Sequence, residues 1–249
     1  MTTNPPTENT GNSWELLNEM YQTNRARDLA GQVHELEFGG VPKETGSLLY
    51  GLIRQFHPRQ TIETGFAFGF STLFILQALA DNGNGRHLAI DPVESTRWHG
   101  IGLANVQRSG HAAIFQHIET ISQIALPSML QNQFQTDFAF VDGSHLFDEA
   151  LLDAYYVDRL LVPGGIMVID DWHHMPAVRS AVNFVEANYA YEVLSFPVAT
   201  NVRVLRKIQG PAREWNHFVP FVVPTEAQLR AEPRPIVLPF TPMGEVNLA

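Results

Sequence analysis

The order of apolar and amphipathic segments predicts an α/β protein built on a doubly wound, mostly parallel sheet that ends in an antiparallel hairpin. Short strand-like runs alternate with helix-length segments from residue 60 to residue 188, which is the pattern of βα units in a parallel sheet. Two further strand-like runs, 190–197 and 201–208, are separated by only three residues, too few for a helical crossover. We therefore expect five βα units followed by a hairpin at one edge of the sheet.

The individual elements follow from apolar periodicity and from the glycines and prolines between them. The expected strands are 60–64, 87–91, 113–117, 137–142 and 165–170, and the expected helices after them are 71–80, 97–109, 121–131, 146–161 and 176–188. Apolar residues at helical spacing predict two earlier helices, over 14–30 and 44–57. Residues 1–12 are polar and are expected to be disordered, so the main domain should cover 13–208.

Proline recurs through residues 209–249, interleaved with Trp215, Phe218, Phe221 and Phe240. Proline at this density excludes regular helix and central strand, whereas the aromatic side chains argue against a freely solvated tail. We interpret the segment as an arm packed on its own domain or on a partner subunit, which in the second case predicts a homodimer or higher homo-oligomer. A poorly ordered tail is the alternative.

Composition excludes several classes of protein. The chain has 249 residues and a net charge of −10, so its surface should repel nucleic acid and anionic membranes, and neither is expected as a partner. The absence of cysteine excludes a disulfide framework, a zinc-thiolate site and a cysteine nucleophile. No apolar run approaches the roughly 20 residues of a membrane helix, and the polar beginning of the chain is unlike a secretory signal. A cytoplasmic protein is expected.

The first strand of the sheet meets its helix through a glycine loop, with the pattern E-x-G-x-x-x-G-x-S over residues 63–71. Glycine lets the backbone approach a ligand and adopt positive φ, and the spacing differs from the G-x-G-x-x-G of dinucleotide sites. The pattern resembles the first motif of class I S-adenosylmethionine (SAM) methyltransferases, which have a Rossmann-like fold. The resemblance implies SAM as cofactor, with Gly65 and Gly69 beneath its methionine end. An ordinary tight turn is the alternative.

The ends of the neighbouring strands supply the other cofactor residues. Asp91 ends the second strand, where ligands of open parallel sheets bind, and its carboxylate can accept hydrogen bonds from a ribose diol. The alternative for Asp91 is a turn residue ahead of Pro92. Glu63 is expected to anchor the methionine amino group or else to brace the loop, and Ser71 to bind the methionine carboxylate or else to cap the helix. Thr120 is expected near the adenine.

Three carboxylates should gather where the fourth and fifth strands end, namely those of Asp142, Asp170 and Asp171. Two unit charges ~5 Å apart repel by roughly 3 kcal/mol at an effective dielectric near 20. Such a cluster therefore requires protonation or a bound cation, and hard oxygen ligands suit Mg²⁺, Mn²⁺ or Ca²⁺. The alternative is that one member of the pair simply caps the following helix.

This cluster extends the resemblance to metal-dependent O-methyltransferases of the catechol O-methyltransferase type and to their bacterial relatives that modify sugars and secondary metabolites. In that family an acid on the fourth strand and a pair on the fifth hold the metal, which implies Asp142, Asp170 and Asp171 as ligands of a divalent cation such as Mg²⁺. Asp142 is also placed beside the cofactor. His145 stands where the catechol enzymes have a lysine as general base, and imidazole can also take a proton at neutral pH. Alternatively, His145 could be a fourth ligand of the metal or simply the residue at which the following helix begins.

These observations predict a SAM-dependent O-methyltransferase that acts by direct displacement on a hydroxyl of a small molecule, such as a sugar, a catechol-like compound or a secondary metabolite. Two alternatives stay open: a relative of cephalosporin hydroxylase, which has this fold and other chemistry, and a non-catalytic SAM-binding protein. Trp172, His173 and His174 follow the acid pair in a loop that is expected to contact substrate. Trp172 would either stack on a ring or sugar face, or cover the domain.

Overall fold

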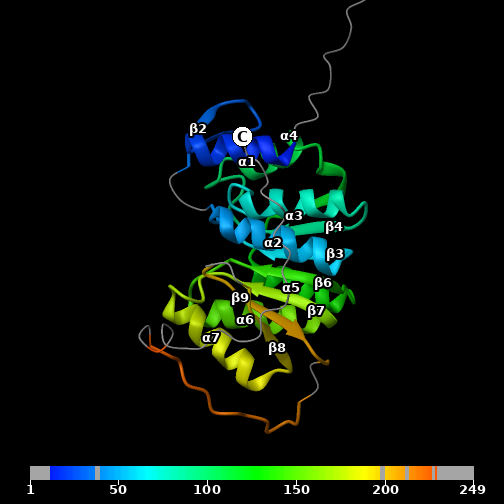
Figure 1. Cartoon of the computed structure of the whole chain (residues 1–249), viewed down its shortest axis with the longest axis vertical. Helices are drawn as coiled ribbons and strands as arrows, with labels where there is room; N and C mark the ends of the chain where they lie inside the picture. The colour runs from blue at the N-terminus through cyan, green and yellow to red at the C-terminus, as the bar shows by residue number, and fades with distance from the viewer. Residues whose placement is uncertain (1–11, 37–39, 197–199, 211–212, 226–227, 229–249) are drawn as a thin grey trace, which may run out of the picture.

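The central sheet has seven strands in the order β5-β4-β3-β6-β7-β9-β8. The computed structural model of the chain describes residues 12–36, 40–196, 200–210, 213–225 and 228. The strands of the sheet are β3 (Gln60–Thr64), β4 (Arg86–Ile90), β5 (Phe115–Ile118), β6 (Thr136–Val141), β7 (Leu161–Ile169), β8 (Tyr191–Leu194) and β9 (Arg203–Lys207). Pairing is parallel except along β9, which is antiparallel to both of its neighbours. Figure 1 shows β4, β3, β6 and β7 side by side in this order. The predicted α/β fold class is confirmed.

Helices cover both faces of the sheet. The helices are α1 (Ser13–Thr23), α2 (Lys43–Phe56), α3 (Phe70–Asp81), α4 (Ile101–Arg108), α5 (Ser122–Gln131), α6 (Phe147–Leu160) and α7 (Pro176–Asn188). Successive residues of β6 point to opposite faces. Phe138 and Phe140 join a core cluster with α1, α2 and α3, whereas Ala139 and Val141 join one with α5, α6 and α7. This alternation explains why the central strands are apolar throughout.

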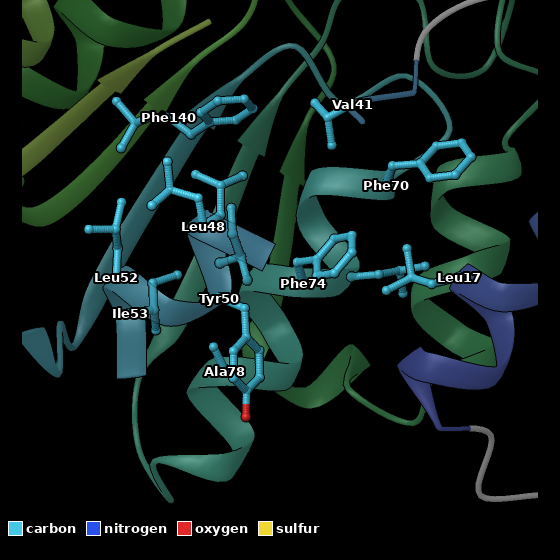
Figure 2. Packing of buried hydrophobic residues seen from close by; sticks show 14 of the residues in the cluster. Leu17, Val41, Leu48, Tyr50, Leu52, Ile53, Phe70, Phe74, Ala78 and Phe140 are labelled. Atoms are coloured by element: carbon cyan, nitrogen blue, oxygen red, sulfur yellow. The ribbon is translucent and has the colours of Figure 1, made fainter. Parts of the chain in front are cut away.

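The contact between α2 and α3 depends on a small residue. Figure 2 shows Phe74 of α3 lying between α2 and Leu17 of α1, with Leu48 of α2 beneath Phe140 of β6. A Cβ placed on Gly46 of α2 would overlap the Phe74 ring. Glycine inside a helix costs up to about 1 kcal/mol relative to alanine. The close packing of the Phe74 ring against α2 explains why residue 46 is a glycine.

Several element boundaries differ from the sequence predictions. The first helix ends at Thr23, not near residue 30, because Asn24 adopts a left-handed conformation (φ 53°) and its N–H binds the Met20 carbonyl. A short hairpin follows, formed by β1 (Arg25–Arg27) and β2 (Val33–Glu35), which the sequence analysis missed. α4 begins at Ile101 and not at residue 97, after Gly100 with φ 69°. The final hairpin is present, but residues 195–202 separate its strands.

The two ends of the chain are described only in part. Disorder was expected over residues 1–12. Residues 1–11 and 229–249 lie outside the described residues, whereas Asn12 caps α1 by accepting a hydrogen bond from the Trp14 N–H. Residues 213–225 form no regular helix or strand, as their prolines predict, and Figure 1 shows them passing α7. Within the described ranges no helix is long and apolar enough to cross a membrane.

Candidate functional site

A cavity of about 640 Å³ lies where β3, β4, β6 and β7 end, at their carboxyl ends. Its size falls in the range of small-molecule sites, and its position is where open parallel sheets bind ligands. The lining residues come from the segment before α2, the loops after β3, β4, β6 and β7, and the connection before β9. They include Gly40, Val41, Pro42, Gly65, Ser71, Asp91, Arg97, Trp98, Asp142, His145, Asp170, Asp171, His174 and Asn201.

The glycine loop lies directly against the end of β6. Gly65 has φ 85°, its N–H binds the Ile90 carbonyl at 2.9 Å, and a Cβ on it would overlap the carbonyl oxygen of Asp142. Gly69 has φ 80° and precedes α3, where a Cβ would lie 3.3 Å from Cα of Gly102. Both positions require glycine. Gly65 lines the cavity, whereas Gly69 does not line it and lies where the loop enters α3.

Asp91 holds the glycine loop in place and also lines the cavity. One carboxylate oxygen accepts hydrogen bonds from the N–H groups of Phe66 and Ala67, both at 3.0 Å, and the other from the N–H of Val93 at 2.9 Å. Each carboxylate oxygen can accept more than one hydrogen bond. The carboxylate therefore keeps acceptor capacity for a ligand hydroxyl while it orders the loop.

Glu63 lies beneath the loop and not in the cavity wall. Its side chain is fully buried, accepts hydrogen bonds from the hydroxyls of Ser71 (2.8 Å) and Thr72, and lies 3.1 Å from Nε2 of His87. The His87 ring is held from its other side by Thr61, 2.8 Å from Nδ1. This geometry is that of a loop-bracing carboxylate, the alternative role for Glu63. Ser71 lines the cavity and is oriented by Glu63.

A second cavity, of about 280 Å³, adjoins the first and shares Gly65, Asp91, Trp98, Gly143 and Ser144 with it. Its remaining walls include Pro92 and Val93 after β4, and Ile121, Ser122 and Gln123 after β5. Thr120 is not among the lining residues, although it immediately precedes three that are. The prediction for Thr120 thus fell on the correct loop, but the residues that face the cavity are the three that follow it.

Asp142, His145 and Asp171 form a cluster whose ligand atoms all lie within 4.8 Å of one another. Nε2 of His145 lies 2.6 Å from an Asp171 oxygen, which raises the pKa of His145 and lowers that of Asp171. Burial raises the pKa of Asp142 well above its usual range, and the nearby charge of Asp170 adds to the effect. The donor set of carboxylate oxygens and an imidazole fits a divalent cation.

Asp170 is held apart from this cluster, although it lines the same cavity. One of its oxygens accepts a hydrogen bond from the Asp171 N–H at 2.9 Å, and burial raises the pKa of Asp170 to about 6. Asp142, Asp170 and Asp171 were expected to form one group of ligands. The structure brings all three to one rim but places His145, and not Asp170, within ligand distance of the other two.

Asn201 is the main functional residue that the sequence analysis missed. Its amide nitrogen donates to Asp171 at 2.6 Å, and its amide oxygen accepts from the N–H groups of His173 and His174, both at 3.0 Å. It reaches the site from the connection before β9. Trp172 does not line the large cavity: its side chain is 9% exposed and packs in the core with α6 and α7. The structure therefore supports the alternative in which Trp172 covers the domain and does not stack on a ligand. His174 lines the cavity instead.

The loop between β4 and α4 carries a buried acid behind Asp91. Glu94 has no exposed surface, and one of its oxygens accepts a hydrogen bond from the Leu103 N–H at 3.0 Å. No partner for the other oxygen is found in the part of the chain that is described. Burial raises the pKa of Glu94 to about 8, and Asp91 contributes by charge repulsion.

Sequence comparison places this chain near one group of enzymes. Residues 62–172 match a family described as a methyltransferase domain. Caffeoyl-CoA O-methyltransferase of Stellaria longipes is 27% identical over 149 residues, which cover 57% of this chain and 58% of that protein. A probable caffeoyl-CoA O-methyltransferase of Arabidopsis thaliana is 33% identical over 156 residues, or 58% of this chain and 62% of that protein. The chain spans about three-fifths of the length of these relatives.

Solved structures share the fold. The O-methyltransferase from Bacillus cereus in complex with SAH has a TM-score of 0.61 at 15% identity, covering 78% of this chain and 90% of that one. TomG from Streptomyces achromogenes, an O-methyltransferase of tomaymycin synthesis in complex with SAM, has a TM-score of 0.60 at 18% identity, covering 80% and 90%. The fold is therefore that of class I methyltransferases, as the resemblance stated from the sequence implied.

Proposed function

We propose that this protein is a SAM-dependent O-methyltransferase that methylates a hydroxyl of a small molecule and is assisted by a divalent cation. The observation that carries the proposal is the pair of adjoining cavities. They meet at Gly65 and Asp91, and the larger one ends at Asp142, His145 and Asp171. One cavity suits a nucleoside, and the other leaves room for a second molecule beside proton-accepting and cation-binding groups.

The cofactor half of the site fits SAM. Because Gly65 has no side chain, the glycine loop packs against the Asp142 carbonyl and lines the cavity, and the Asp91 carboxylate beside it can accept hydrogen bonds from a ribose diol. The smaller cavity, between Pro92 and the residues after β5, would take the adenine. Bound SAM supplies an electrophilic methyl group. The protein contributes mainly by holding the acceptor oxygen in line with that methyl, because orientation lowers the barrier of a displacement.

Asp142 and Asp171 would supply the oxygen ligands of the cation half of the site, with Asp170 and His145 beside them. A bound divalent cation would lower the pKa of an acceptor hydroxyl. Mg²⁺ is the first candidate because oxygen ligands dominate the set. His145 is the group that can take the acceptor proton: Nε2 is held by Asp171, which orients the ring and leaves Nδ1 as the nitrogen that can accept the proton, and the raised pKa makes the imidazole a stronger base.

The first experiment measures SAM binding by calorimetry. We expect Asp91→Ala to weaken SAM binding by roughly 1.5–3 kcal/mol, because it removes a charged hydrogen-bond acceptor. Glu35→Gln, on the exposed β2 strand, is a matched control that removes a carboxylate elsewhere. Absence of SAM binding to the unaltered protein would refute the proposal, and unchanged affinity in Asp91→Ala would refute the placement of the ribose.

The second experiment measures transfer of a labelled methyl group from SAM to catechol, caffeoyl-CoA and a hydroxylated sugar, with Mg²⁺ and with chelator. Transfer to any of these acceptors supports the proposal, and full activity in chelator refutes the role of the cation. SAM binding without transfer favours the alternative of a non-catalytic SAM-binding protein.

One observation favours a second candidate, an enzyme related to cephalosporin hydroxylase. His145 contributes an imidazole to the cluster, and His174 lines the same cavity. Imidazole ligands suit iron and other transition metals better than Mg²⁺. Consumption of oxygen that depends on added Fe²⁺, in the absence of methyl transfer, would establish this candidate and exclude the first.

A further inference from the structure

Arg179 of α7 is a buried cation whose described partners are all backbone carbonyl oxygens. Its side chain is 3% exposed, although a buried arginine is ordinarily paired with a carboxylate. Nε donates to the Trp172 carbonyl at 3.1 Å, one terminal nitrogen to the His173 carbonyl, and the other to the Pro224 carbonyl at 3.3 Å. The planar guanidinium thus joins two segments that are far apart in the sequence.

The first of these segments, residues 219–224, lies along α7 and is called here the docked segment. Asn188 both donates to and accepts from the backbone of Val219, at 3.0 and 2.7 Å. Asn183 donates to the Val222 carbonyl at 3.1 Å. The Phe184 and Phe221 rings meet edge to face with centroids 5.7 Å apart. Figure 1 shows the chain beyond β9 running past α7. The docked segment is therefore fastened to α7 by polar side chains and by one aromatic contact.

The second segment is the loop that brings Asp171 and His174 to the cavity. Two α7 residues that hold the docked segment also hold this loop: Arg179 binds the Trp172 and His173 carbonyls, and Asn183 accepts from the Trp172 indole N–H at 3.4 Å. Asp171 has φ 58°, a left-handed conformation that is uncommon for residues other than glycine. Such a conformation persists only where its surroundings hold it.

We propose that Arg179 is a positioning residue for the site, and that docking of residues 219–224 on α7 sets the placement of Asp171 and His174 through it. The inference rests on the proposed function insofar as Asp171 is a cation ligand. Loss of the guanidinium leaves buried carbonyl oxygens without donors, and the loop then relaxes away from the geometry that it needs. Lysine keeps the charge but cannot replace a three-way planar donor.

The test compares three full-length variants: Arg179→Lys, Phe221→Ala and, as matched control in the same segment, Val222→Ala. The Val222 side chain is 79% exposed, and its carbonyl, which binds Asn183, stays in place. Two readouts are needed, the hydrogen-exchange rate of the His173 and His174 amides and the affinity for Mn²⁺ by electron paramagnetic resonance. SAM affinity is measured in parallel.

We expect Arg179→Lys to accelerate exchange at both amides and to weaken Mn²⁺ binding by ~10–100-fold, the usual effect of losing a residue that orients a metal ligand. Phe221→Ala should shift both readouts in the same direction by less, Val222→Ala should shift neither, and SAM affinity should change less than twofold in all three. Unchanged loop exchange in Phe221→Ala overturns the proposal, as does an equal effect in Val222→Ala. Phe221→Ala decides the question if Arg179→Lys does not fold.

Hydrogen exchange also separates this inference from the proposed function. If the unaltered protein binds no Mn²⁺, the cation-assisted function fails. The exchange rates of the loop amides in Phe221→Ala then still confirm or overturn the coupling between the docked segment and the loop.

Discussion

Replacement of Glu94 by glutamine should make the protein more stable at alkaline pH. The Glu94 side chain is fully buried between β4 and α4, and burial raises its pKa from 4.5 to about 8. Glutamine has nearly the same shape, is neutral at every pH, and keeps an oxygen that can accept the Leu103 N–H. The substitution therefore removes a titration while it preserves the packing and the hydrogen bond.

The direction and size of the effect follow from the two pKa values. A carboxyl whose pKa is raised by folding binds its proton more tightly in the folded state, so its contribution is fully present below pH 4.5 and is lost as pH rises to about 8. One pKa unit corresponds to about 1.4 kcal/mol. The full loss is then about 5 kcal/mol, of which about 3 kcal/mol has been lost by pH 7.

The assay is urea unfolding, followed by far-ultraviolet circular dichroism, at pH 5 and pH 8.5. Between these pH values the unaltered protein should lose about 2–4 kcal/mol more unfolding free energy than Glu94→Gln. Other buried acids such as Asp142 and Asp170 are present in both proteins, so their contributions cancel in the comparison. Equal pH dependence of the two proteins would show that Glu94 stays ionised in the fold, and would refute the reasoning.

Three further predictions concern the core and the site. Gly46→Ala should lower the free energy of unfolding, measured by chemical denaturation, by about 1–3 kcal/mol, because the alanine Cβ overlaps the Phe74 ring. At an unhindered helical position the same change would raise the stability. Removal of divalent cations by EDTA should suppress methyl transfer, and Mg²⁺ or Mn²⁺ should restore it in the unaltered protein but not in Asp142→Ala. His145→Ala should lower kcat by about 10²–10⁴-fold with little change in SAM affinity, and a near-normal kcat would exclude His145 as the base.

The parts of the fold that the sequence predicted are those with a strong repeating pattern. The alternation of apolar runs and helix-length segments indicated the parallel strands of the sheet and the helices between them. The β1–β2 hairpin was not predicted because its strands, Arg25–Arg27 and Val33–Glu35, are three residues long and mostly polar, so they show no apolar alternation. The end of α1 was misplaced because a left-handed Asn24, and not a glycine or proline, ends it.

The site was predictable wherever a residue directly follows a strand. Asp91, Asp142 and Asp170 were identified in this way, since the ends of parallel strands share one rim. Asn201 could not be identified, because an isolated asparagine has no motif and its approach to Asp171 depends on the reversed direction of β9. The separation of Asp170 from Asp142 and Asp171 could not be predicted either, because it depends on a local hydrogen bond from the Asp171 N–H to the Asp170 carboxylate.

The close approach of Gly65 to the Asp142 carbonyl lies at the boundary between two halves of the sheet. The proposed cofactor side of the cavities comes from β3, β4, β5 and the loops after them, whereas the proposed acceptor and cation side comes mainly from residues after β6 and β7 and from Asn201. The two sides meet along one line, where β3 pairs with β6. A chimera that replaces residues 136–225 with the matching segment of a relative should therefore acquire the acceptor preference of that relative and retain its own cofactor. Such an exchange must preserve the backbone facing Gly65 and the packing of Phe138 and Phe140.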